Sequence, residues 1–154
     1  MTPEQRLEQL GIILPKTPVP VANYVPWRFA GSLLYLSGQG PKLLDGTYSV
    51  GRLGLTADVA KGYSDARLTG LQLLAVAKAA LGELSRIEAV VKLLGMVNAE
   101  ADFSDHPKVI NGCSDLLVEV LGDAGKHARS AIGVGSLPNR MTVEIEAILL
   151  VRPA

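Results

Sequence analysis

The chain has 154 residues, of which 48% are hydrophobic and only 5% aromatic, so aliphatic side chains must build its core. This is the usual length of one domain with one hydrophobic core. Fifteen basic residues balance fifteen acidic ones, and the sequence contains no run of lysine or arginine. Because nucleic acids are bound chiefly through accumulated positive charge, the composition disfavours a nucleic-acid partner.

The compartment is indicated by three features. The single cysteine, Cys113, has no internal partner for a disulfide, so nothing indicates an oxidising environment. Residues 1–10 are charged and lack the apolar centre of a signal peptide. The most apolar stretch, residues 147–151, is too short to span a bilayer. We therefore expect a cytoplasmic protein that does not bind membranes.

A short helix is predicted over residues 2–10, because Thr2 can cap it and Pro3 suits its first turn. The connector that follows should be extended and irregular, since proline fixes the backbone and removes a hydrogen-bond donor. Its prolines are Pro15, Pro18 and Pro20. We treat residues 1–20 as an N-terminal extension and residues 21–154 as a single domain.

Three strands and a long helix are expected next. The strands cover residues 24–30, 33–36 and 47–50, and an Asp-Gly turn dipeptide precedes the third. The helix should run from Thr56 to Gly82, because apolar residues recur at helical spacing between them and glycine suits a helix end.

The second half of the chain predicts a strand, a helix and two more strands. Residues 87–97 are dense in valine, leucine and isoleucine, as in a strand buried on both faces. Asp105 should cap the helix and Gly122 should end it. Strands over residues 128–135 and 141–151 complete the set. The order predicts an α+β domain, a mixed sheet with two helices packed on one face, plus the short N-terminal helix.

The last predicted strand has two different faces. The odd-numbered residues between 141 and 151 are all apolar and should face the helices. The other face carries Glu144 and Glu146 and then turns apolar at Ile148 and Leu150. We therefore expect a polar cleft beside buried contacts on that face, and alternation alone leaves open which glutamate lines it.

The preceding strand places Arg129 on a face otherwise lined by Ala131 and two glycines. An arginine with this much room around it suits a pocket for a small anion. The alternative is a structural ion pair with a glutamate at an interface.

Other reactive side chains favour ordinary roles. Cys113 lies on the apolar stripe of its helix and fits the core, and His106 fits a helix start. His127 either touches the site of Arg129 or lies at an exposed strand edge. Ser130 has no histidine and acid partner at a recognisable spacing, which disfavours a serine hydrolase. Two histidines and one cysteine also disfavour a zinc site, so no metal is expected.

Several motifs, in order along the chain, resemble those of the RidA/YjgF (endoribonuclease L-PSP-like) family. Tyr24 falls where the family has an N-terminal tyrosine, and Asn111 matches its usual helix asparagine. The remaining motifs are Ser37-Gly38-Gln39, His127-Ala128-Arg129-Ser130-Ala131, Leu137-Pro138 and Val143-Glu144-Ile145-Glu146-Ala147.

The resemblance implies a chorismate-mutase-like fold and a homo-oligomer, a trimer in the family, with clefts between subunits. It also implies hydrolysis of reactive enamines and imines of amino acids to 2-keto acids and ammonia, without a cofactor. In this reading Arg129 binds the substrate carboxylate and Glu144 places the attacking water.

The resemblance assigns four further residues to the substrate cleft. Tyr24 and Asn111 would line the cleft, and Gly38 would shape its wall. Ala131 stands where many family members carry a cysteine, a departure that marks a divergent branch. The proposed chemistry needs no thiol.

Two other functions stay open. The first is a non-catalytic binder or regulator of small carboxylates, which would use Arg129 without turning anything over. The second is the ribonuclease or translation-inhibitor activity attached to the family name, which the neutral charge disfavours.

Overall fold

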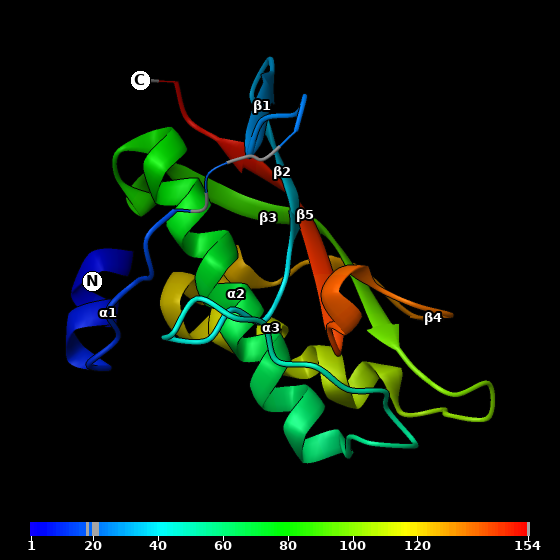
Figure 1. Cartoon of the computed structure of the whole chain (residues 1–154). Helices are drawn as coiled ribbons and strands as arrows, with labels where there is room; N and C mark the ends of the chain where they lie inside the picture. The colour runs from blue at the N-terminus through cyan, green and yellow to red at the C-terminus, as the bar shows by residue number, and fades with distance from the viewer. Residues whose placement is uncertain (18, 20–21, 154) are drawn as a thin grey trace.

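The computed structural model describes residues 1–17, 19 and 22–153, and it confirms the predicted α+β architecture (Figure 1). Pro18 and Pro20 of the predicted connector lie outside the described residues. The helices and strands are α1 (Pro3–Gln9), β1 (Trp27–Ala30), β2 (Leu33–Gln39), α2 (Val59–Leu81), β3 (Ile87–Asn98), α3 (His106–Leu121), β4 (Ala128–Val134) and β5 (Val143–Val151). Short 3-10 helices are η1 (Leu84–Arg86), η2 (Gly122–Gly125) and η3 (Pro138–Arg140).

The sheet is mixed, in the order β1-β2-β5-β3-β4. All neighbouring strands are antiparallel except β3 and β4, which are parallel. Parallel strands need a crossover connection, and α3 provides it here. Strand β4 is last in the strand order, so it is an edge strand, and it contacts α3.

Helices α2 and α3 pack against each other and lie together on one side of the sheet (Figure 1). The odd-numbered residues of β5 face these helices, as predicted, because each of them is buried. They are Val143, Ile145, Ala147, Leu149 and Val151. No helix in the part of the chain that the structure describes has the length and apolar character needed to cross a membrane.

Helix α2 begins later than predicted. Asp58 rather than Thr56 is its N-cap, and the Asp58 carboxylate accepts a hydrogen bond from the backbone N–H of Lys61 at 2.9 Å. The Thr56 hydroxyl instead accepts from the backbone N–H of Arg52 at 2.8 Å. The predicted end at Gly82 is confirmed, with a φ of 82° that suits glycine.

The strand predicted over residues 47–50 is wrong. This segment forms only isolated bridges, Lys42 with Tyr48 and Val50 with Met141. Its one buried side chain, Ser49, donates a hydrogen bond to the Asp65 carboxylate at 2.8 Å. The segment is therefore fixed by a side-chain contact with α2 rather than by a backbone ladder.

Asp65 is a buried carboxylate that joins three parts of the fold. It accepts hydrogen bonds from Ser49 and from the Thr142 hydroxyl at 2.6 Å. We expect Asp65→Ala to lower the free energy of unfolding by about 2 kcal/mol, because two buried hydroxyls lose their acceptor. Urea unfolding measures this, and Asp115→Ala is the matched control because Tyr63 donates to Asp115 at the surface. Equal small losses in both variants would contradict the assignment.

The predicted N-terminal helix is confirmed as α1. Thr2 caps it, and the Thr2 and Gln5 side chains each accept from the other residue's backbone N–H. Leu7 is buried against the core, and Glu4 accepts from the backbone N–H of Leu84 at 2.6 Å. The helix is therefore attached to the body of the fold.

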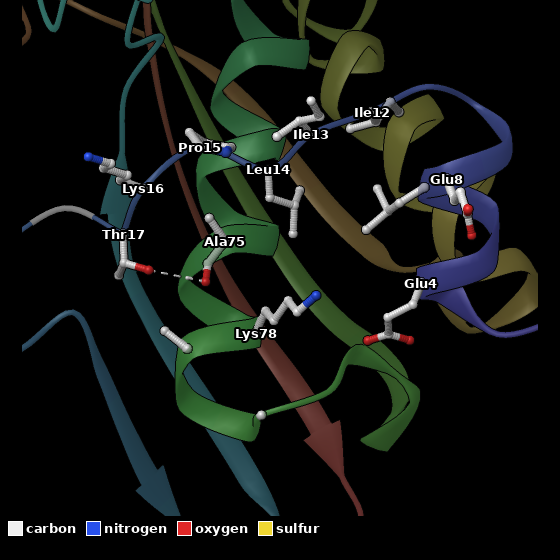
Figure 2. Close-up of a pocket in the computed structure, with 13 residues that line it drawn as sticks. Glu4, Glu8, Ile12, Ile13, Leu14, Pro15, Lys16, Thr17, Ala75 and Lys78 are labelled. Carbon is white, nitrogen blue, oxygen red and sulfur yellow. Dashed lines mark hydrogen bonds between the residues drawn. The ribbon is translucent and has the colours of Figure 1, made fainter.

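Residues 12–17 continue from α1 along α2, where the Thr17 hydroxyl donates to the Ala75 carbonyl at 3.5 Å (Figure 2). A pocket of about 770 Å³ lies between this segment and α2. Its lining includes apolar side chains together with Glu4 and Lys78. None of the predicted site residues lines it, so the candidate site is elsewhere.

Candidate functional site

Arg129 lies on the edge strand β4, on the face of the sheet that the helices cover. It pairs in register with Leu93, which in turn pairs with Ala147. Directly opposed residues share one face of a sheet, and both partners are buried under the helices. The arginine side chain is half-buried and points toward α3.

One nitrogen of the Arg129 guanidinium is held by α3. Its Nη1 donates to Asn111 Oδ1 at 2.8 Å and to Ser114 Oγ at 3.0 Å. Asn111 and Ser114 are three residues apart, so both point from one face of the helix. The structure thus brings Arg129 and Asn111 together, as the site prediction requires.

The other two nitrogens of the guanidinium, Nε and Nη2, donate to no side chain or backbone atom in the described part of the chain. No Asp or Glu oxygen of the described residues lies within 4 Å of Arg129 either. The structural ion pair considered for this residue is therefore not made within one chain. A planar edge with parallel N–H donors stays available, and a carboxylate fits such an edge.

Ala131 is on the same face as Arg129, two residues further along β4. It pairs in register with Gly95 and packs against the hydrophobic core. We refer to Arg129, Asn111 and Ala131 as the arginine group. Its members come from the facing surfaces of α3 and β4.

Glu144 lies on the opposite face of the sheet. It pairs with Met96 and is an odd number of residues from Ala147, so its side chain points away from the helices. A Cβ built on Gly38 would lie 2.8 Å from Glu144 Oε2, so Gly38 leaves the space that the carboxylate occupies. Glu146 shares this face but is exposed, whereas Glu144 is half-buried.

Burial raises the pKa of the Glu144 carboxyl, and the neighbouring Glu146 raises it further. None of the hydrogen bonds in the described residues is donated to it. A half-buried carboxyl with a raised pKa and free oxygens can exchange protons closer to neutral pH than an ordinary glutamate.

Tyr24 is 53% exposed and precedes β1. The carbonyl of the next residue, Val25, accepts a hydrogen bond from Ser37 Oγ at 2.6 Å, which fixes this segment beside Gly38. We refer to Glu144, Gly38 and Tyr24 as the glutamate group. Within one chain Arg129 and Glu144 lie on opposite faces of the sheet.

Sequence reasoning missed Ser114 and left His127 undecided. Ser114 Oγ and His127 Nε2 are 2.9 Å apart, and His127 Nδ1 lies 2.6 Å from the Gly125 carbonyl oxygen. The signal was present in the spacing, since Asn111 and Ser114 are three apart on a helix and His127 and Arg129 two apart at a strand. That the two pairs face each other follows from the packing of α3 over β4, which the spacing alone does not give.

Cys113 is fully buried in the core between α2 and α3. Burial raises the pKa of its thiol to about 12, although the nearby Arg129 opposes this shift. This fits the core role expected for it. No three potential metal ligands gather among residues 1–17, 19 and 22–153, and a cofactor-free site stays a prediction.

We expect Glu144→Gln to stabilise the fold at neutral pH. The folded chain holds the Glu144 proton more tightly than the unfolded chain, so ionisation above the usual value of 4.5 costs stability. Removing the charge should gain up to about 1 kcal/mol at pH 7, discounted because the side chain is half in water. Thermal unfolding of both proteins from pH 4 to pH 8 checks this, with the exposed Glu88→Gln as control. A difference that does not shrink toward pH 4 would contradict it.

Comparison with known proteins gives a consistent result. Residues 4–145 match the model of the family described as "YjgF/chorismate mutase-like, putative endoribonuclease". Protein TCP17 of Trypanosoma cruzi is 42% identical over 93% of this chain and 90% of its own length. The structure of Atu1372 from Agrobacterium tumefaciens has 44% identity and a TM-score of 0.89, covering 98% of this chain and 94% of that one. TdcF of E. coli, solved with bound serine, has 26% identity and a TM-score of 0.65, covering 92% and 98%.

Proposed function

Because the chain belongs to the YjgF/chorismate mutase-like family, we propose that it hydrolyses small enamines and imines derived from amino acids. The products are 2-keto acids and ammonia. The reaction takes place in a cleft between two copies of the chain and needs no cofactor. We keep the cytoplasm as the compartment in this proposal.

The observation that carries the proposal is the unpaired edge of the Arg129 guanidinium. Its Nη1 is fixed by Asn111 and Ser114, so the planar guanidinium is oriented before any ligand binds. A guanidinium binds a carboxylate through two parallel hydrogen bonds, which fixes both its position and its orientation. TdcF, with serine bound in its structure, supports a small carboxylate ligand for this fold.

A second copy of the chain is needed to unite the two groups. No helix of the described residues covers the face that carries Glu144, and apolar side chains are partly exposed across it. They are Tyr35, Leu94, Met96, Ile132, Ile148 and Leu150. An apolar sheet face of this kind suits burial against another copy, and we propose a closed homo-oligomer, a trimer, in which one copy supplies the arginine group and its neighbour the glutamate group.

The chemistry follows from these positions. Arg129 holds the substrate carboxylate next to the C=N carbon, and an enamine first takes a proton on carbon to become the imine. Glu144 of the neighbouring copy orients a water and accepts its proton as the oxygen adds to that carbon. The nitrogen takes up protons and leaves as ammonia when the C–N bond breaks, and the C=O of the keto acid forms. Water is the only co-reactant.

A non-catalytic carboxylate binder is the second candidate. It is favoured by the same fixed guanidinium and by the structure of TdcF with bound serine. A ribonuclease is less well supported, because fifteen basic and fifteen acidic residues leave no net charge for a phosphate backbone.

The test generates 2-aminoacrylate or 2-iminobutyrate with a serine/threonine dehydratase and follows 2-keto acid release with and without this protein. We expect acceleration by the native chain and its loss in Arg129→Ala. Acceleration that survives in Arg129→Ala would overturn the site. If there is no acceleration but 2-ketobutyrate binds saturably in a way that depends on Arg129, the protein is a carboxylate binder rather than an enzyme.

A further inference from the structure

A continuous hydrogen-bonded chain joins Arg129 to the backbone of η2. Arg129 Nη1 lies 3.0 Å from Ser114 Oγ, Ser114 Oγ lies 2.9 Å from His127 Nε2, and His127 Nδ1 lies 2.6 Å from the Gly125 carbonyl oxygen. All three side chains are half-buried between α3 and the start of β4. In the imine hydrolysis proposed above, Arg129 binds the substrate and Ser114 only holds the arginine in place, while His127 has no role.

The donor in each of these bonds is fixed by chemistry. A carbonyl oxygen only accepts, so His127 Nδ1 must carry a hydrogen and donate it to Gly125. In the neutral ring His127 Nε2 is then an acceptor, and the Ser114 hydroxyl is the group that donates to it. A guanidinium only donates, so Ser114 Oγ accepts from Arg129.

Ser114 Oγ is therefore polarised from both sides. Its hydroxyl donates a hydrogen bond to an imidazole nitrogen, and the oxygen lies beside the permanent positive charge of Arg129. Both contacts favour formation of the alkoxide. A hydroxyl oxygen has two lone pairs, and Arg129 takes only one of them. The other lone pair is available to attack an electrophilic carbon.

The surroundings keep His127 in the form that accepts a proton. Partial burial lowers the pKa of the ring, the nearby Arg129 lowers it further, and the hydrogen bond to Gly125 opposes them. The lowered pKa favours the neutral form of the ring. A general base also needs a fixed tautomer in which Nε2 carries no proton and can accept one.

We propose that Ser114 is a nucleophile and His127 its general base, giving the chain a second activity: hydrolysis of small esters or thioesters that carry a carboxylate. The free edge of Arg129 anchors the carboxylate of the substrate and directs its acyl carbon to Ser114. This activity shares the carboxylate anchor Arg129 with the imine hydrolysis but uses neither an imine nor Glu144, so labelling of Ser114 tests it separately.

The steps balance with water as the only co-reactant. Ser114 Oγ forms a bond to the acyl carbon while its proton passes to His127 Nε2. The bond to the leaving alkoxide or thiolate breaks, and that group takes the proton from His127. Water then adds to the acyl-serine and gives its proton to the same nitrogen. Ser114 recovers a proton from His127 as the carboxylic acid leaves.

The direct test is labelling of the full-length native protein with a fluorophosphonate, followed by peptide mass spectrometry. We expect the label on Ser114, with loss of fluoride. His127→Gln should slow labelling at least about 100-fold, as expected for loss of a general base. Ser130→Ala is the matched control, because Ser130 lies on the opposite face of β4 and accepts instead from Lys92.

A second arm tests the substrate class with two p-nitrophenyl esters, the hemisuccinate and the uncharged butyrate. We expect faster hydrolysis of the hemisuccinate, lost in Ser114→Ala and reduced toward the butyrate rate in Arg129→Ala. Absence of label on Ser114 in the folded native protein would overturn the proposal and leave Ser114 as a positioning residue for Arg129. Labelling that is unchanged in His127→Gln would overturn the role of the histidine.

Discussion

Arg129→Ala should lower kcat/KM for imine hydrolysis on the order of 1000-fold, because the substrate loses both its carboxylate anchor and its alignment with the water. Arg129→Lys should recover little of this, since a lysine ammonium is a single point charge rather than a planar fork. The three rates are compared by 2-keto acid release at saturating and low substrate.

The matched control for this prediction is Arg67→Ala. Arg67 pairs with Glu119 at 2.8 Å on the surface of α2 and α3, so its loss should cost no more than about 0.5 kcal/mol of stability and leave turnover unchanged. The Arg129 variants must also keep their melting temperature to be informative. If Arg129→Lys were as active as the native chain, bidentate binding of the carboxylate would be contradicted.

Gly112→Ala should lower the free energy of unfolding by more than about 3 kcal/mol, because it forces two packed helices apart. A Cβ at this position of α3 would meet the backbone carbonyl of Tyr63 on α2, and it would lie 3.1 Å from the backbone nitrogen of Arg67. Backbone atoms of a helix do not move aside as a side chain does. Chemical denaturation of the variant measures the loss.

Gly70→Ala is the control that isolates this packing effect. Its Cβ would lie 2.9 Å from Leu116 Cδ2 and 3.2 Å from Cys113 Sγ, and the nearest backbone atom, Cys113 Cα, would be at an ordinary contact distance of 3.5 Å. Alanine also favours a helix over glycine by about 1 kcal/mol. The two effects oppose each other, so the net change should be within about 1 kcal/mol. Similar losses for both variants would contradict the contact between the helix backbones. Displacement of α3 should also reduce activity in Gly112→Ala, because Asn111 moves with it.

Most of the fold could be predicted because apolar residues recur at regular spacing within its main helices and strands. The alternation of β5 and the apolar stripe of α3 each follow one buried face, so the predicted type and orientation of both elements were correct. Helix α2 is buried all round over residues 72–77, and its predicted type was correct although its burial is not confined to one stripe. The strand predicted over residues 47–50 was wrong because the geometry of this segment depends on Asp65. Asp65 is a buried acid 16 residues after Ser49, and no local pattern reveals the contact. The predicted start of α2 was two residues too early, because Thr56 and Asp58 are both good capping residues.

The site residues were found by motif, but their grouping was not visible in the sequence. Alternation gives the face of a residue only within its own strand, and relating Arg129 to Glu144 required the register of β4, β3 and β5. The pairing of Ser114 with His127 depends in turn on how α3 lies over β4. Tertiary packing rather than local spacing therefore decides which side chains can act together.

The most direct test of the composite cleft is complementation between Arg129→Ala and Glu144→Ala. Each variant alone should be inactive in imine hydrolysis. Co-expressed with different tags and isolated as mixed oligomers, the two should regain about a third of the native activity, since one of the three clefts in each mixed trimer combines an intact arginine group with an intact glutamate group from the neighbouring copy. Recovery of that order is the result we predict. Mixed oligomers that form but stay inactive would contradict a site shared between two copies.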